Sequence, residues 1–195
     1  MCEGIYRLRM MRMKPFIYPE MMVHVPLCTH KEPNQVLIIS DSAEELEQEV
    51  ARHADVAAKS LGAAKALDAL RNEADQSADV LLLEGTTDAA AIAHASRVLK
   101  SDGLMVMQHP SLDDVAANTA LMEVLRNYFK IIMPYHVGNG ETLLLASKLY
   151  HPTADIILQR TDLLEGLQYY NCDIHPAAFA MPNYVRKAYL GVIKN

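Results

Sequence analysis

Short apolar runs alternate along this chain with longer segments in which apolar residues recur at helical spacing. The runs at 36–39, 79–83 and 104–108 have the length of strands and are largely unbroken, as in strands that are covered on both faces of a parallel sheet. The segments 42–53, 62–74, 89–100 and 111–128 carry apolar residues three and four positions apart and predict helices. This alternation predicts an α/β fold.

The end of the alternation predicts a hairpin. Two further runs, 131–133 and 142–147, are joined by a turn at 137–141, and strands with so short a connection must be antiparallel. A Rossmann-like, mainly parallel sheet with helices on both faces and a terminal antiparallel hairpin is the pattern of class I methyltransferase-like folds. We expect a single domain over 1–195, in which 1–15 forms a remnant N-terminal strand or half of a hairpin.

Single residues predict several helix boundaries. Ser42 and Glu45 have the spacing of a capping box. Gly103 suits a left-handed exit from the helix before it, and Ser111 is a candidate N-cap for the helix after it. The segment 153–167 also has a helical pattern.

Polar residues that follow the first two strands mark a candidate ligand site. Ser40, Asp41 and Ser42 form the turn after the first strand, which is the usual place for a nucleotide or cofactor in an open α/β sheet. Glu84 ends the second strand at the same edge, where such sheets place their chemistry.

A segment before the first strand could contribute a polar pocket. It predicts a short helix that begins at Glu20, after Pro19, and packs on the sheet. Tyr18, Glu20 and His24 would line the pocket, with Glu20 and His24 four residues apart on one helical face. The alternative is that Glu20 and His24 form a helical pair that caps the edge of the sheet.

Composition narrows the function classes. The formal charge of −6 argues against nucleic acid and favours cationic partners. Cys2, Cys28 and Cys172 are odd in number and far apart, which predicts a reducing, cytoplasmic setting without a disulfide framework or a zinc site. The histidines make no metal-binding pair, and no apolar stretch is long enough for a signal peptide or a membrane span. We therefore expect no metal, no nucleic acid and no membrane partner.

Two stretches resemble the spermidine synthase (polyamine aminopropyltransferase) family. The family tail, YYN-x-D-[IV]-H-R-A-A-F-x-[LM]-P-N-[FY]-V, is matched at 169–185, with Pro176 where the family has Arg. The family's Y-[HQ]-E-M-x-x-H-x-P is matched at 18–26, with Pro19 at the His/Gln position. The segments around 79–83, 104–108 and 134–147 resemble the strand before the family's catalytic Asp, its next strand and its last hairpin.

The resemblance implies aminopropyl transfer from decarboxylated S-adenosylmethionine, as a co-substrate, to a polyamine such as putrescine, with no tightly bound cofactor. Glu84 stands at the position of the family's catalytic Asp, and Tyr18, Glu20, His24, Gln108 and Tyr135 would shape the polyamine cleft. Family members commonly associate, and the Met-rich start of the chain also predicts a homodimer.

The chain departs from the family on the donor side. The family's GGGDGG turn corresponds to 40–45, where no glycine remains, and glycines there let the backbone approach a ligand closely. No acid stands at a ribose-binding position, where Lys59 and Ser60 fall nearest. The gate loop after Glu84 is nearly absent, and the family's N-terminal β-domain is largely missing. We expect weak donor binding.

Three hypotheses about function remain open. The first is a divergent aminopropyltransferase. The second is a non-catalytic relative that binds a polyamine or nucleoside, or acts only through protein partners. The third is a methyltransferase-like enzyme with another acceptor. The retained polyamine-side and tail motifs favour the first two over the third, and the lost donor turn favours the second over the first.

Overall fold

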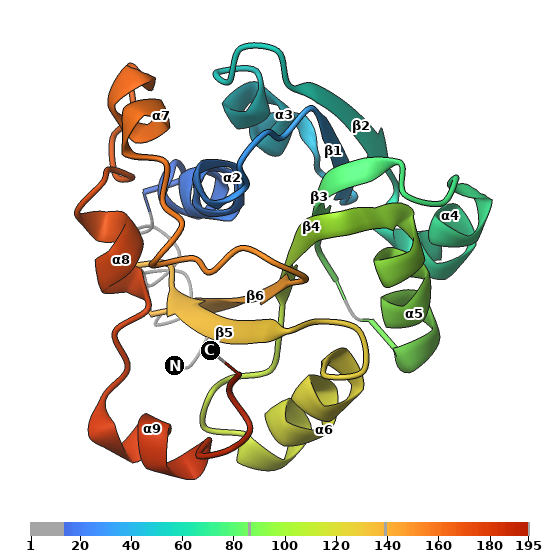
Figure 1. Ribbon diagram of the computed structural model, residues 1–195, viewed down its shortest axis with the longest axis vertical. Coiled ribbons are helices and arrows are strands. Elements are labelled where there is room, and N and C mark those ends of the chain that lie inside the picture. Colours follow the sequence, from blue (N-terminus) through green and yellow to red (C-terminus); the bar gives the residue numbers. More distant parts are fainter. Residues whose placement is uncertain (1–13, 86, 139, 195) are drawn as a thin grey trace, which may run out of the picture.

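Six strands form one sheet within residues 14–85, 87–138 and 140–194, which the computed structural model describes. They are β1 (Gln35–Ile39), β2 (Ala57–Leu61), β3 (Ala78–Leu83), β4 (Leu99–Gln108), β5 (Ile131–His136) and β6 (Thr142–Ser147). Their order in the sheet is β2-β1-β3-β4-β6-β5 (Figure 1). The first four strands are parallel, and β6 is antiparallel to both β4 and β5. The predicted hairpin is confirmed.

Helices cover both faces of the sheet, as predicted. The described helices are α2 (Ile17–Thr29), α3 (Glu44–Val50), η1 (Ala63–Lys65), α4 (Ala66–Asn72), α5 (Ala89–Val98), α6 (Val115–Leu125), α7 (Leu158–Leu163), α8 (Ile174–Ala178) and α9 (Asn183–Ala188). Figure 1 shows α2 and α3 on one side of the sheet and α4, α5 and α6 on the other. None of these helices is long and apolar enough to cross a membrane.

Alternate residues of each central strand enter two different cores. In β3, Val80 and Leu82 join the core beneath α2, whereas Leu81 and Leu83 join the core beneath α4, α5 and α6. Every residue of β3 is buried. This is why the strand has an unbroken apolar sequence, since a strand that is covered on both faces has no position for a solvated side chain.

Helix α2 lies against the sheet and is buried along almost its whole length. It begins at Ile17, three residues before the predicted start at Glu20, because Pro19 falls in the first turn, where a missing N–H costs no helical hydrogen bond. A helix that is apolar nearly all round suits this position.

Three predicted helix boundaries are wrong. Helix α3 begins after Ala43 with no side-chain cap, so Ser42 and Glu45 form no capping box. Asp114, and not Ser111, caps α6 by accepting from the N–H of Ala117 at 3.0 Å. Gly103 lies inside β4, where an added Cβ would come within 3.1 Å of the Asp79 carbonyl oxygen, so it permits close strand packing and not a helix exit.

Two other expectations concern the ends of the chain. Within 153–167, only Leu158–Leu163 is helical, and the rest consists of turns, bends and irregular backbone. The strand or hairpin expected at 1–15 lies almost wholly outside the described residues.

Candidate functional site

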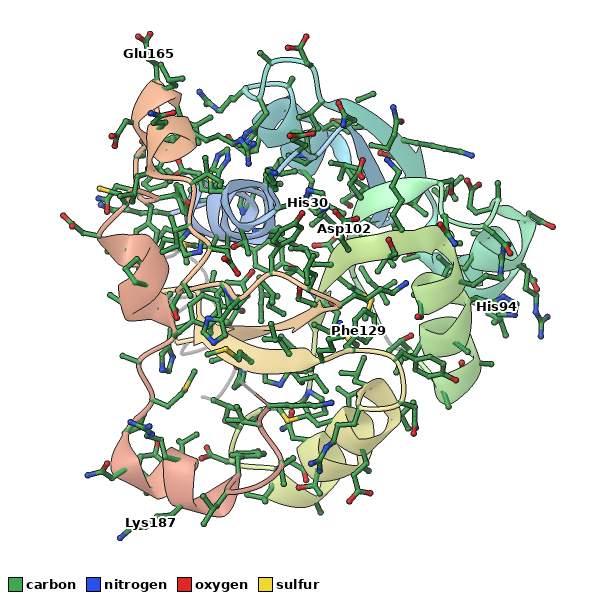
Figure 2. The ribbon with its side chains drawn as sticks, in the orientation of Figure 1. His30, His94, Asp102, Phe129, Glu165 and Lys187 are labelled. Atoms are coloured by element: carbon green, nitrogen blue, oxygen red, sulfur yellow. The ribbon has the colours of Figure 1, made fainter. Side chains whose placement is uncertain are left out.

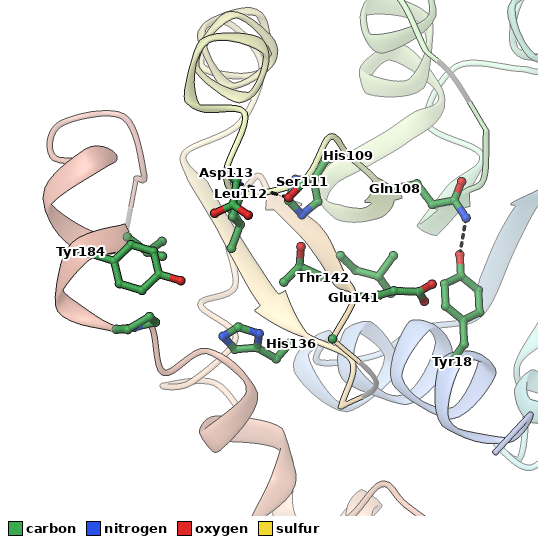
Figure 3. Close-up of a pocket in the computed structure, with 14 residues that line it drawn as sticks. Tyr18, Gln108, His109, Ser111, Leu112, Asp113, His136, Glu141, Thr142 and Tyr184 are labelled. Atoms are coloured by element: carbon green, nitrogen blue, oxygen red, sulfur yellow. Dashed lines mark hydrogen bonds between the residues drawn. The ribbon is translucent and has the colours of Figure 1, made fainter. Parts of the chain in front are cut away.

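Four of the predicted site residues meet at the carboxyl edge of the sheet. Ser40 and Glu84 follow β1 and β3, and Ser40 Oγ donates a hydrogen bond to Glu84 Oε2. Gln108 ends β4, where its Oε1 accepts from the N–H of Gly85 at 3.0 Å and its Nε2 donates to the Tyr18 hydroxyl at 2.9 Å (Figure 3). Because β1, β3 and β4 are adjacent and parallel, their carboxyl ends bring these polar groups together.

Tyr18 connects this group to the adjacent surface. Burial raises the pKa of the Tyr18 hydroxyl, and the neighbouring Glu84 carboxylate, to which it is hydrogen-bonded, raises that pKa further. Tyr18 therefore stays protonated at neutral pH, because a phenolate beside a carboxylate is unfavourable. It donates to Glu84 and accepts from Gln108, so Glu84 receives hydroxyl hydrogen bonds from both Ser40 and Tyr18.

A pocket of about 470 Å³ opens beside Tyr18 and Gln108 (Figure 3). Two carboxylates, those of Asp113 and Glu141, belong to its wall, and the described lining residues include no Lys or Arg. The wall is formed by Tyr18, Gln108, His109, Ser111, Leu112, Asp113, His136, Gly140, Glu141, Thr142, Leu143, Pro182, Tyr184 and Val185. Carboxylates in the wall of a concave site favour a cationic ligand. Glu84 is not part of this wall and is linked to it through Tyr18.

Sequence reasoning missed most of the residues in this wall. His109 and Asp113 follow the end of β4, and His136 and Glu141 flank the turn between β5 and β6. Their positions just beyond strand ends were the signal that could have found them. Tyr184 reaches the pocket from α9, and no local pattern indicates that placement.

Glu20 does not line the pocket, contrary to the prediction. Its side chain is only 1% exposed, and its two carboxylate oxygens accept from the backbone N–H groups of Gln168, Tyr169 and Tyr170 at 2.8–2.9 Å. Glu20 thus fixes the C-terminal segment to α2. Three N–H donors satisfy a carboxylate that would otherwise be costly to bury.

His24 and Tyr135 are also structural, which corrects their predicted place in the cleft. His24 is fully buried, with Nδ1 2.9 Å from His53 Nε2 and Nε2 2.9 Å from Glu49 Oε2. Tyr135 is fully buried as well, and its hydroxyl donates to the carbonyl oxygen of Met21 at 3.1 Å. Both side chains therefore connect α2 to its neighbours and leave the pocket wall to other residues. Glu20 and His24 each bond to other segments, so they do not act as the helical pair of the alternative.

The turn after β1 binds its own chain. The N–H of Ser42 donates to Ser40 Oγ at 2.9 Å, and Asp41 Oδ1 accepts from the N–H groups of Ala63 and Ala64 at 2.8 and 3.2 Å. The described residues of this turn have no positive φ, so its backbone does not follow a path that requires glycine. The backbone donors nearest the end of β2 are thereby occupied by a side chain of the protein.

One cluster has the residue types of a metal site but not the free ligand atoms. His30, Asp79 and Asp102 bring one ligand atom each within 4.8 Å of one another, at the opposite end of the sheet. Lys100 Nζ already lies 2.7 Å from Asp79 Oδ1. His30 Nδ1 accepts from the N–H of Glu32, so His30 Nε2 carries the proton and has no lone pair for a cation. His30 and Asp102 are labelled in Figure 2.

Comparison with known proteins finds relatives among the polyamine aminopropyltransferases. The chain matches the spermine/spermidine synthase domain over residues 15–61. It is 33% identical over 115 residues to the polyamine aminopropyltransferase of Helicobacter acinonychis, an alignment that covers 56% of this chain and 44% of that protein. It is 28% identical over 220 positions to the polyamine aminopropyltransferase of Clostridium beijerinckii, covering 88% of this chain and 77% of that protein.

The solved structures agree on the fold. The spermidine synthase from Thermotoga maritima superposes with a TM-score of 0.79 at 22% identity, covering 92% of this chain and 75% of that one. A similarity at this level of identity shows the fold alone. The chain spans less than half the length of the Helicobacter proteins that it matches.

Proposed function

We propose that the chain is a member of the spermidine synthase (polyamine aminopropyltransferase) family and that it transfers an aminopropyl group from decarboxylated S-adenosylmethionine to a polyamine. The nitrogen of a neutral amine attacks the carbon next to the sulfonium. A C–N bond forms, the C–S bond breaks, and methylthioadenosine leaves with the electron pair. The observation that carries this proposal is the pocket beside Tyr18, whose described wall contains two carboxylates.

The attacking amine must lose a proton, and Tyr18 and Glu84 would accept it. The Tyr18 hydroxyl faces the pocket and donates to Glu84, so it can accept the proton of the amine while its own proton moves to the carboxylate. Gln108 holds the hydroxyl in place from the other side. Most of the remaining rate enhancement would come from holding the amine next to the donor carbon in the right orientation.

A second candidate is a non-catalytic relative that binds a polyamine. The closed turn favours it, since Asp41 occupies the N–H groups of Ala63 and Ala64 on the donor side. The two candidates share the polyamine pocket and differ only in whether a donor nucleoside reaches the Glu84 edge of the sheet.

We also propose that the protein is a cytoplasmic homodimer. The cysteine composition supports the compartment, and the association of family members and Met10, Met11 and Met13 support the dimer; these methionines lie outside the described residues. Light scattering that returns a monomer at high protein concentration would refute the dimer.

Product formation tests the proposed function. The protein is incubated with decarboxylated S-adenosylmethionine and putrescine, and methylthioadenosine is measured. We expect product only when both substrates are present, and about a hundredfold loss of kcat or more in Glu84→Gln and Tyr18→Phe. S-adenosylmethionine in place of the donor serves as a control for methyl transfer.

A calorimetric titration with putrescine separates the candidates. Putrescine binding without product formation at any donor concentration would establish the non-catalytic candidate. If putrescine does not bind, the polyamine pocket itself is refuted. Methylated amine formed from S-adenosylmethionine would instead support the methyltransferase-like hypothesis.

A further inference from the structure

The tautomer of His109 is fixed by a buried asparagine. The Nδ2 of Asn118 lies 2.8–3.1 Å from the carbonyl oxygens of Pro110, Ser111 and Asp114, so this atom must be the amide nitrogen. Its Oδ1 therefore faces His109 Nδ1, at 2.7 Å, and accepts a hydrogen bond from it. Asn118 is fully buried, which leaves the amide no other orientation. The neutral imidazole of His109 thus carries its proton on Nδ1 and a lone pair on Nε2.

The acceptor at His109 Nε2 has no partner. It is buried, and no described group donates a hydrogen bond to it. Burial lowers the pKa of His109, against the opposing effect of Asn118, so the ring is neutral and Nε2 is an acceptor at neutral pH. A buried acceptor without a donor is unfavourable, and a ligand that supplies the donor would remove that cost.

His109 belongs to the walls of two adjacent pockets. One is the pocket beside Tyr18, and the other, of about 620 Å³, lies between α5 and α6 and is lined mainly by small apolar residues. The acidic side chain in the apolar pocket, Asp88, already caps α5 by accepting from Ala91. The pocket between α5 and α6 also includes Thr87 and Gln108, but the carboxylates of Asp113 and Glu141 belong to the pocket beside Tyr18, where Figure 3 shows His109 with Asp113 and Thr142.

We propose that His109 Nε2 accepts a hydrogen bond from an ammonium group of the bound polyamine and so selects for ligands with two amino groups. The inference rests on the proposed function and adds a specificity-determining residue to the same pocket. While one amine lies against Tyr18, the second ammonium donates a hydrogen bond to His109. The Asp113 carboxylate in the same pocket wall attracts its positive charge. Neither a monoamine nor an apolar ligand could satisfy both places at once.

Calorimetric titrations with putrescine and with n-butylamine, which has the same carbon chain and one amino group, test the proposal. We expect wild-type protein to prefer putrescine. His109→Leu removes the acceptor and should weaken putrescine binding about ten- to a hundredfold, with a much smaller effect on butylamine. His109→Gln keeps an acceptor oxygen and should retain part of the preference. Thermal unfolding of each variant shows whether it is folded.

Nitrogen NMR of the imidazoles gives a second readout that does not depend on catalysis. We expect His109 to show a protonated Nδ1 and a bare Nε2, and the Nε2 signal to shift when putrescine is added. A protonated Nε2 in the free protein, or an equal preference for putrescine in wild type and His109→Leu, would overturn this inference and leave the proposed function standing. If wild-type protein binds no putrescine, both are overturned.

Discussion

At the scale of single residues, Glu20 belongs to a motif that resembles the family's, and in this structure it stabilises the fold. Its carboxylate accepts three backbone hydrogen bonds from 168–170, on a segment far away in the sequence. Those N–H groups belong to no helix or strand, so without Glu20 the buried N–H of Tyr170 would have no partner within a helix or strand. The match at Tyr18–Pro26 and the match at the tail are therefore physically connected, and this contact gives both segments one structural role.

Replacing this carboxylate should destabilise the protein. Glu20→Gln keeps the shape but replaces one acceptor oxygen with an NH₂ group that faces N–H donors. We expect the free energy of unfolding to fall by at least about 2 kcal/mol, because charge-assisted hydrogen bonds are lost and buried donors are left unpaired. Denaturant unfolding measures the change. Glu45→Gln, on the exposed side of α3, is the matched control and should change stability by less than about 0.5 kcal/mol. Equal effects of the two substitutions would contradict the role given to Glu20.

At the scale of elements, buried histidines attach α2 to its surroundings. His24 on α2 contacts His53 and Glu49 at the end of α3, and Thr29 on α2 lies 3.5 Å from His175 of α8. Burial lowers the pKa of His53 to about 3 and that of His175 to about 4. Both rings are therefore neutral in the folded protein at pH values where they would be charged in the unfolded chain.

These histidines predict acid destabilisation. Between about pH 6.5 and pH 4 the unfolded chain binds protons that the native protein does not, so stability falls as the pH falls through this range. Each histidine contributes up to about 1.4 kcal/mol per pH unit. Urea midpoints at pH 7, 6 and 5 should fall in wild type, and His53→Gln and His175→Gln should each flatten the slope. A slope that is unchanged in both variants would show that other groups cause the acid sensitivity.

The elements could be predicted from sequence to different degrees. Strands such as β3 were predictable because burial on both faces leaves an unbroken apolar run. Helix ends were not, because several neighbouring polar residues compete for one role. Asp114 and not Ser111 caps α6, while the amide of Asn118 binds the carbonyls of Pro110 and Ser111. The residue types alone do not tell which of these residues caps the helix.

The same distinction applies to the site. Ser40, Glu84 and Gln108 could be placed together because each follows a strand of a parallel sheet. The burial of Glu20 and Tyr135 could not be predicted. Their hydrogen-bond partners lie more than a hundred positions away in the chain. Polar residues at strand ends were thus easier to assign to a site than polar residues on a helix, whose partners depend on how the whole chain packs.

At the scale of the whole molecule, the two sides of the proposed reaction cleft differ. The side proposed to bind the polyamine is an open pocket built from the ends of β4, β5 and β6, with Tyr18 of α2 and Tyr184 of α9. The donor side, between the ends of β1 and β2, is held closed by hydrogen bonds within the chain. A ligand that enters there must compete with Asp41 for the N–H groups of Ala63 and Ala64.

The donor nucleoside should therefore bind weakly to this protein. The closed turn, the absence of an acid at the end of β2 and the short connection from Glu84 to α5 all act in the same direction. A missing charge-assisted hydrogen bond alone weakens binding by about one to two orders of magnitude.

If Asp41 is the main obstacle, Asp41→Gly frees two backbone donors and should tighten methylthioadenosine binding about tenfold. Asp68→Ala, which replaces an exposed aspartate on α4, is the control and should not change the binding. Calorimetric titration of the three proteins with methylthioadenosine decides the matter. Micromolar binding by wild type, with no gain in Asp41→Gly, would mean that the turn does not block the donor and that full aminopropyl transfer should be expected.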